Sequence, residues 1–176
     1  MASIIYKINP YRRVFNKRVR NIAAKIPKGS KVLEIGSGPI TYRNLFPDCE
    51  FIGTDLIKGK NVDVVADVRK LPFKKNEFDY VLCFSVLEHV FETEKALSEM
   101  HRCLKKNGTL IVSVPFLYPL HDEPGDFYRF TQFALKKMLS AKFSSVKVES
   151  MYYLPPIMRL FKKLIHNNIA FAKNKK

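Results

Sequence analysis

The chain has 176 residues, of which 47% are apolar and 27% are charged. That balance is typical of one folded domain and excludes a wholly disordered or collagen-like chain. No stretch of about 18 uncharged apolar residues occurs, so we expect no membrane-spanning helix. The first residues lack the order of a secretory signal, in which basic residues precede a long apolar core.

The net charge of +15 is concentrated at the two ends of the chain. Residues 1–30 and 151–176 contain basic residues and no acidic ones, whereas the middle of the chain is nearly neutral. Basic ends favour an anionic partner, either nucleic acid or a membrane face, although a need for solubility would also explain them. The cysteines form no C-x-x-C pair, which favours buried, reduced thiols in a cytoplasmic protein.

Apolar strands alternate with helices along most of the chain. A first helix is expected at residues 11–26. Buried strands are expected at 31–35, 51–55, 62–67, 78–84, 109–114 and 145–152, and further helices at 86–104, 132–141 and 157–170. Residues 105–108 are expected to form a turn, and Thr131 to cap the helix that follows it. The alternation predicts an α/β fold with a mostly parallel, doubly wound sheet and helices on both faces.

A turn with two glycines follows the first expected strand, in the segment VLEIGSG at residues 32–38. Glycines let the backbone approach a ligand closely, and ligands of open parallel sheets bind at the carboxyl ends of the strands. Asp55 ends the second strand, where an acid can accept hydrogen bonds from ribose hydroxyls. Asp67 ends the third strand and can accept one from the exocyclic amine of adenine. These positions predict a nucleoside-binding site.

The acidic residues around this turn determine which cofactor suits it. A dinucleotide site normally has a third glycine where the helix meets the pyrophosphate, and here that position is Thr41. Glu34, Asp55 and Asp67 would repel a pyrophosphate. S-adenosyl-L-methionine carries a ribose, an adenine, a sulfonium and an ammonium group but no phosphate, so it suits these acids.

Six segments resemble, in order and spacing, the motifs of the class I S-adenosylmethionine-dependent methyltransferases. They are VLEIGSGP (32–39), GTDL (53–56), ADVRKLPF (66–73), FDYV (78–81), LEHV (87–90) and LKKNGTL (104–110). The resemblance covers residues 30–150 and implies a Rossmann-like, seven-stranded sheet whose last strand is reversed. Here Pro155-Pro156 and an expected helix follow the sixth strand, so the seventh strand is expected to be missing or very short.

The charge distribution and the resemblance together divide the chain, and the resemblance implies a set of cofactor contacts. A basic N-terminal helical segment (1–29) would precede the cofactor-binding methyltransferase domain (30–154), and a basic amphipathic helix (155–176) would follow it. The implied cofactor-binding residues are Glu34, Gly36, Gly38, Asp55, Leu56, Asp67, Val68, Phe84 and Ser85. The glycine turn would hold the methionine part, and the two aspartates the ribose and the adenine.

A second unusual stretch, PFLYPLHDEPGDFYRFT at residues 115–131, follows the fifth expected strand. It resembles a P-x-H-x-x-P-x-D-[FY]-x-R-[FY]-T segment of small methyltransferases, many of them encoded with surface polysaccharide or lipid biosynthesis. His121 is the candidate catalytic base, because an imidazole ordinarily titrates near neutral pH. The candidates for acceptor binding are His89, Asp126, Tyr128 and Arg129. In the alternative interpretation, Asp126 and Arg129 pair with each other and only brace the loop.

No metal ion is expected from the sequence. The histidines show no metal-ligand spacing, and nothing in the pattern indicates that His121, Asp122, Glu123 and Asp126 converge.

Together these features predict methyl transfer to an oxygen or nitrogen atom of a small-molecule, glycan or lipid-intermediate acceptor. One alternative is an RNA methyltransferase that holds phosphates with the basic ends. Nucleic acid is the weaker prediction, because CFSV at 83–86 replaces the [DNS]-P-P-[FYW] motif of adenine N-methyltransferases and Cys83 follows a leucine rather than a proline. Another alternative is a non-catalytic protein that binds S-adenosylmethionine.

The expected last helix has an apolar stripe beside basic residues, between residues 157 and 166. Such a helix can lie in a lipid headgroup layer, where anionic lipids attract its lysines. Such a helix would allow a cytoplasmic protein to make peripheral contact with an anionic membrane. Packing of the helix on the sheet, or a dimer contact, is the alternative.

Overall fold

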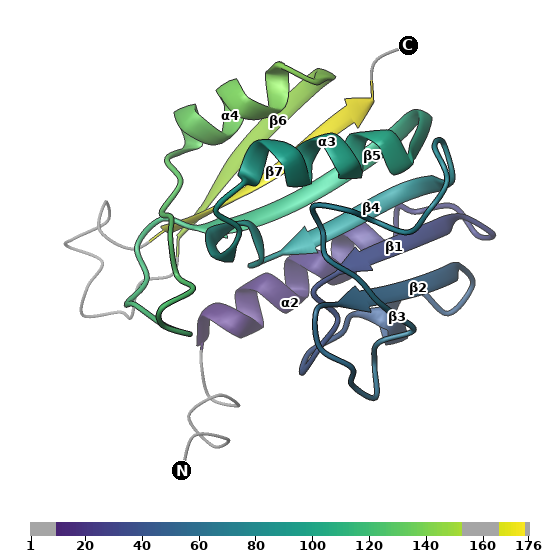
Figure 1. Ribbon diagram of the computed structural model, residues 1–176, viewed down its shortest axis with the longest axis horizontal. Coiled ribbons are helices and arrows are strands. Elements are labelled where there is room, and N and C mark those ends of the chain that lie inside the picture. The colour runs from purple at the N-terminus through teal and green to yellow at the C-terminus, as the bar shows by residue number, and fades with distance from the viewer. Residues whose placement is uncertain (1–9, 153–165, 175–176) are drawn as a thin grey trace.

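The computed structural model describes residues 10–152 and 166–174, which form one sheet with helices on both faces (Figure 1). The helices are α2 (Pro10–Ala23), α3 (Thr93–Cys103) and α4 (Gln132–Ser140), with single 3-10 turns η1 (Arg43–Leu45) and η2 (Leu87–His89). The strands are β1 (Lys31–Ile35), β2 (Glu50–Asp55), β3 (Val64–Val65), β4 (Phe78–Phe84), β5 (Leu104–Pro115), β6 (Phe143–Tyr152) and β7 (His166–Asn174). Among these helices, none is long and apolar enough to cross a membrane.

The seven strands lie in the order β3-β2-β1-β4-β5-β7-β6. All pairs from β3 to β5 are parallel, and β7 runs antiparallel to both of its neighbours. The chain order reverses between β1 and β4, which is where ligands bind in open α/β sheets. The predicted mostly parallel, doubly wound α/β fold is confirmed.

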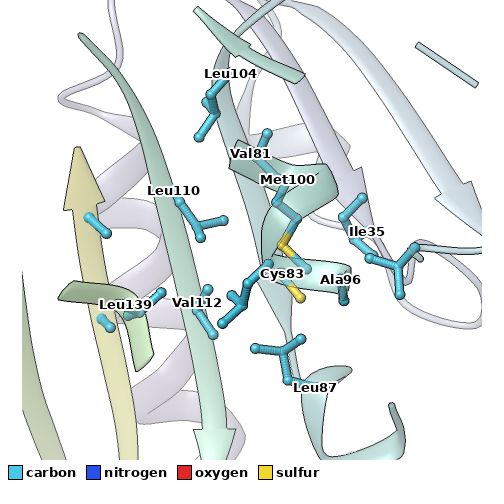
Figure 2. Close-up of a cluster of buried hydrophobic side chains, with 14 of the residues drawn as sticks. Ile35, Val81, Cys83, Leu87, Ala96, Met100, Leu104, Leu110, Val112 and Leu139 are labelled. Carbon is cyan, nitrogen blue, oxygen red and sulfur yellow. The ribbon is translucent and has the colours of Figure 1, made fainter. Parts of the chain in front are cut away.

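Alternating side chains of the central strands build a separate apolar core on each face of the sheet. On one face, Leu33, Val81 and Val112 pack with residues of α3 and α4 in a buried cluster (Figure 2). On the other face, Val32, Leu82 and Ile111 pack against α2. Figure 1 accordingly shows α3 and α4 in front of the sheet and α2 behind it. Strands buried on both faces explain why their sequences are nearly continuous apolar runs.

Helix α2 ties the basic N-terminal segment to the sheet. Phe15, Val19 and Ile22 are buried at helical spacing, whereas Arg13 and Lys17 are exposed. The predicted helix is confirmed, and it ends at Ala23, a few residues before its expected end. Its apolar stripe is therefore used for packing, and its basic face is left for solvent or a partner.

The helix expected at 86–104 is interrupted, so that prediction is wrong in its first part. Leu87–His89 form the 3-10 turn η2, Val90 is extended, and α3 begins at Thr93. Leu87 and Glu88 are fully buried. The turn η2 and the extended residue Val90 after it place both side chains against the rest of the fold.

The turn expected at 105–108 is instead part of β5, which begins at Leu104. The pairing with β4 shifts between Phe78 and Tyr80, so the additional residues form an irregularity within the strand. Asn107, with a φ of 63°, gives the segment the character of a turn that its sequence indicates. The third strand is shorter than expected and is limited to Val64–Val65.

The expectation of a missing or very short seventh strand is wrong, as is the expected helix where it covers residues 166–170. Those residues belong to β7, a strand inserted between β5 and β6. Asn168, Ile169, Ala170 and Ala172 are buried. A strand covered on both faces lacks alternation, so periodicity cannot distinguish it from a buried helix. The expected helical residues 157–165 lie outside the described residues, so the membrane-contact prediction stays a prediction.

Asn168 joins β7 to the rest of the fold and allows a test of this register. Its side-chain amide is fully buried, donates to the Phe130 carbonyl at 2.8 Å and accepts from Ser150 Oγ at 2.9 Å. We expect Asn168→Ala to lower the free energy of unfolding by about 1–3 kcal/mol, because buried polar partners lose their hydrogen bonds. Urea unfolding followed by circular dichroism would measure this. Asn21→Ala, on the exposed face of α2, is the control, and equal stability of the two variants would contradict the assigned register.

Candidate functional site

A cavity of about 880 Å³ opens at the carboxyl ends of β1, β2, β4 and β5. The glycine turn after β1 and the ends of β2 and β4 line one part of it. Segment η2 and the loop between β5 and α4, here called the rim loop (residues 116–131), line another part. Two stretches that are far apart in the sequence therefore meet in one site, at the reversal of strand order.

Steric constraints explain both glycines of the turn. Gly36 has a φ of +81°, and a Cβ atom there would lie 2.5 Å from Val86 Cγ2. A Cβ atom on Gly38 would lie 2.8 Å from Asp55 Oδ2, the same oxygen that accepts from the Gly38 amide at 3.0 Å. The turn therefore packs backbone directly against β2 and the residues after β4, which keeps the cavity open above it.

Glu34 holds the turn in place from beneath. Its carboxylate accepts hydrogen bonds from Ser37 Oγ and Thr41 Oγ1, both at 2.6 Å, and from the Tyr42 amide at 3.0 Å. The side chain is almost fully buried, and burial raises the pKa of this carboxyl group. Glu34 lines the cavity, but its hydrogen bonds make it first of all a brace for the glycine turn.

The two aspartates lie at neighbouring strand ends, as the sequence predicts. Asp55 accepts from the amides of Gly38 and Ile57 and lines the cavity. Asp67 accepts from the Arg69 guanidinium at 2.6 Å, and these hydrogen bonds lower the pKa of Asp67. Both carboxylates are thus held in fixed orientations beside the cavity. Each oxygen of a carboxylate has more than one acceptor position, so both can still receive a ligand's donor.

The remaining predicted cofactor residues supply apolar and backbone surface. Leu56 is 66% exposed over the cavity, whereas Val68 reaches into the core. Phe84 stands edge-on to Phe15 of α2, with ring centroids 5.3 Å apart, and Ser85 adopts a φ of 54°. Eight of the nine predicted residues line the cavity. Gly38 does not line the cavity formed by the described residues, but its amide donates a hydrogen bond to Asp55, which does.

Backbone hydrogen bonds dock the rim loop onto η2. The amides of Phe127 and Tyr128 donate to the Glu88 carbonyl at 2.8 and 3.2 Å. His89 Nδ1 lies 2.9 Å from the Gly125 carbonyl oxygen. This docking brings the rings of His89 and His121 to a centroid separation of 4.8 Å, edge to face. Both histidines line the cavity.

Asp126 and Arg129 brace the rim loop, which was the alternative interpretation of their sequence pattern. Arg129 donates to both oxygens of Asp126 at 2.6 Å and to the carbonyls of Tyr118 and Pro119. These bonds hold the pKa of the Asp126 carboxyl well below its usual range. Tyr128 donates from its hydroxyl to the Phe91 carbonyl at 3.1 Å. Within the described residues none of these three lines the cavity, so we assign them to positioning the loop rather than to touching an acceptor.

Glu88 is a further residue of the site, one that the sequence pattern does not indicate. It is fully buried, its carboxylate oxygens have no hydrogen-bond partner among the described residues, and it lines the cavity. Burial raises its pKa to about 8. The pattern placed Glu88 in the first turn of a helix, where an acid is ordinary. Its burial arises from the tight turn η2, which the sequence did not indicate.

The cavity also has an aromatic rim, formed by Phe91, Tyr118 and Phe127, which the sequence pattern does not indicate. Phe91 and Phe127 are 68% and 48% exposed, and their rings meet edge-on with centroids 5.6 Å apart. Both line the cavity together with Tyr118. Exposed aromatic side chains around a cavity mark a surface suited to an apolar or planar ligand.

Residues 33–112 match the model of a family described as a methyltransferase domain. The chain is 35% identical over 165 residues to the ubiquinone/menaquinone biosynthesis C-methyltransferase UbiE of Psychromonas ingrahamii, covering 82% of this chain and 65% of that protein. It is 31% identical over 109 residues to the tRNA (carboxymethyluridine(34)-5-O)-methyltransferase of Arabidopsis thaliana, covering 55% and 27%. The chain thus spans less than two thirds of the length of either relative.

The fold is similar to that of a SAM-dependent methyltransferase from Archaeoglobus fulgidus. The TM-score is 0.73 over 97% of this chain and 98% of that one, at 18% sequence identity. The matched domain, the relatives and the seven-stranded sheet agree with the motifs around the cavity. Residues 33–112 of this chain are therefore a methyltransferase domain, with the fold and the sequence motifs of the class I S-adenosylmethionine-dependent methyltransferases.

Proposed function

We propose that the protein transfers a methyl group from S-adenosylmethionine to a small-molecule, glycan or lipid-intermediate acceptor. The observation that carries this proposal is the joint cavity, in which a glycine turn with acidic neighbours faces a second wall of histidines and aromatic rings. Its volume of about 880 Å³ lies in the range of small-ligand sites. The first wall, formed by the glycine turn and its acidic neighbours, suits the cofactor. The second wall, formed by the histidines and the aromatic rings, suits an acceptor.

The residues of the first wall fit the cofactor chemically. Gly36 lines the cavity, and its lack of a side chain lets a ligand approach the backbone of the turn. Asp55 would accept hydrogen bonds from the ribose, and Asp67 from the adenine amine. When bound, the cofactor supplies an activated methyl group on a positively charged sulfur. The protein's main task is then to align acceptor and methyl group, and alignment alone can supply much of the rate.

The second wall would hold and activate the acceptor. His121 is our candidate for the group that assists removal of a proton from an acceptor hydroxyl. Its Nδ1 lies 3.1 Å from Asp126 Oδ2, an arrangement that fixes the ring and leaves Nε2 for a ligand. His89 and the aromatic rim would contact the body of the acceptor. The named role of one relative in quinone biosynthesis supports an acceptor with a planar or apolar part.

An RNA acceptor is the second candidate. The exposed face of α2 presents Arg13, Lys17 and Arg20, and Arg12 at the start of this helix lines the cavity. Such a row of cations suits a phosphate backbone. The tRNA methyltransferase among the relatives supports the same interpretation. The basic residues also suit peripheral contact with an anionic membrane, which a lipid-linked acceptor would require.

Calorimetric titration with S-adenosylhomocysteine, with NAD as the control ligand, tests the cofactor. Transfer of a radiolabelled methyl group to separated small-molecule, lipid and RNA fractions of a cell extract tests the acceptor. We expect micromolar binding of S-adenosylhomocysteine alone, and label in the small-molecule or lipid fraction. Label confined to RNA would replace the first candidate by the second. Binding without transfer to any fraction would indicate a non-catalytic protein and overturn the proposed activity.

The role of Asp55 generates a quantitative prediction. Hydrogen bonds to a charged group contribute about 1.5–3 kcal/mol, so Asp55→Ala is expected to weaken S-adenosylhomocysteine binding about tenfold or more. Asp48→Ala is the matched control, because the side chain of this aspartate lies at the surface in an ion pair with Lys28 at 2.9 Å. Calorimetry on both variants gives the comparison. An unchanged affinity in Asp55→Ala would remove the residue from the cofactor site.

His121→Ala is expected to separate catalysis from cofactor binding. Loss of a positioned acid–base group lowers turnover by about a hundredfold or more, whereas the cofactor wall is untouched. Labelled methyl transfer would give the turnover, and calorimetry the affinity for S-adenosylhomocysteine. Leu120→Ala, a neighbouring rim-loop position that is 70% exposed, controls for disturbance of the loop. Equal turnover of the two variants would exclude a catalytic role of His121.

A further inference from the structure

One carboxylate and two imidazoles meet at the acceptor side of the cavity. One potential ligand atom from each of Glu88, His89 and His121 lies within 4.8 Å of the others. All three residues line the same cavity. Glu88 and His89 come from η2 and His121 from the rim loop, so the cluster exists only because the loop is docked on η2.

The oxygens of the Glu88 side chain have no hydrogen-bond partner among the described residues. Both oxygens are buried. Burial of a polar group costs free energy unless a partner compensates it, and burial of a charge costs considerably more. The protein nevertheless keeps this side chain fully buried against the cavity rather than turned to solvent. A cation bound among the three residues would supply the missing partner.

Hydrogen bonds hold both imidazoles in the orientation that metal ligands need. His89 Nδ1 lies 2.9 Å from the Gly125 carbonyl oxygen. His121 Nδ1 lies 3.2 Å from the Pro119 carbonyl oxygen and 3.1 Å from Asp126 Oδ2. Each of these acceptors requires a proton on Nδ1, which leaves the lone pair on Nε2. Metal-ligating histidines are usually oriented in this way by a carbonyl or a carboxylate behind the ring.

We propose that Glu88, His89 and His121 bind a divalent transition-metal ion. Two imidazole nitrogens and one carboxylate oxygen suit Zn²⁺ and its neighbours better than Mg²⁺ or Ca²⁺, which prefer oxygen ligands. Three protein ligands leave a coordination position open toward the cavity, as in catalytic zinc sites. The proposal departs from the sequence-based expectation of no metal. Of the four residues considered in that expectation, His121 is a ligand. The Asp126 carboxylate lies next to the Nδ1 atom of His121.

The ion would act on the acceptor of the proposed methyl transfer, so this inference rests on the proposed function. A hydroxyl oxygen of the acceptor would take the open position, where the ion lowers its pKa. The hydroxyl proton passes to water, the oxygen forms a bond to the methyl carbon, and the carbon–sulfur bond breaks with its electron pair left on sulfur. His121 would then serve as a ligand rather than as a free base. The site therefore favours an oxygen acceptor over a nitrogen acceptor.

Metal titration of the full chain tests the site without any acceptor. The protein is freed of metal with a chelator and titrated with Zn²⁺ by calorimetry and with Co²⁺ by visible absorption. We expect one ion per chain at micromolar affinity or tighter, with a Co²⁺ spectrum of low coordination number. Absence of saturable binding by the wild-type chain would overturn the proposal.

Variants locate the binding. Glu88→Gln keeps the side-chain volume, and we expect it and His89→Ala to weaken Zn²⁺ binding at least about tenfold, since each removes one ligand. His101→Gln changes a histidine of α3 that does not belong to the cluster and is expected to bind Zn²⁺ like the wild type. Circular dichroism checks that each variant is folded. Wild-type affinity in folded Glu88→Gln and His89→Ala would place the ion elsewhere and overturn the assignment.

Titration of the same samples with S-adenosylhomocysteine separates this inference from the proposed function. Binding of S-adenosylhomocysteine without binding of Zn²⁺ would remove the metal site and leave the methyltransferase proposal intact. Binding of Zn²⁺ without S-adenosylhomocysteine would support the site and contradict the proposed function. If both hold, labelled methyl transfer should be lost with the chelator and restored by Zn²⁺ or another transition-metal ion.

Discussion

The reversal of strand order between β1 and β4 is the constraint on which the site depends. Because β1, β2, β4 and β5 are parallel, their carboxyl ends meet at one edge of the sheet. The chain leaves β1 toward one side and β4 toward the other, and the segments that follow cannot fill the space between them. The glycine turn, Asp55, η2 and the rim loop all follow these strand ends, so one topological feature assembles both walls of the cavity.

The second wall depends on a chain of polar contacts in addition to the packing of Leu87 and Phe130 in the apolar core. Arg129 fixes Asp126, and Asp126 in turn contacts the backbone amide and the ring of His121. The Glu88 carbonyl accepts the two loop amides that hold this arrangement on η2. Residues without direct access to the cavity thereby determine the orientation of those that line it. A loop held in this way can present histidines at fixed positions while the sheet beneath it remains unchanged.

The cofactor wall was largely predictable because its determinants are local. Gly36 directly follows β1, Asp55 is the last residue of β2 and Asp67 comes two residues after β3. Strands that are buried on both faces can be recognised in the sequence as apolar runs. The acceptor wall was predictable only in its histidines. Glu88 was not, since its burial results from the 3-10 turn η2 and from the loop that covers it. Asp126 and Arg129 were candidates for acceptor contact, but their strongest available partners are each other and the loop backbone.

The sequence alone determined the α/β class, the order of the central strands along the chain and the nature of the cofactor. These features depend on short-range patterns: apolar runs, glycines at strand ends and acids at fixed spacing. Tertiary structure decided that residues 166–174 form β7 and that the helix after β4 is broken. It also decided that Glu88, His89 and His121 converge. Each of these outcomes depends on which distant part of the chain packs against a segment. Local sequence patterns do not indicate such tertiary contacts.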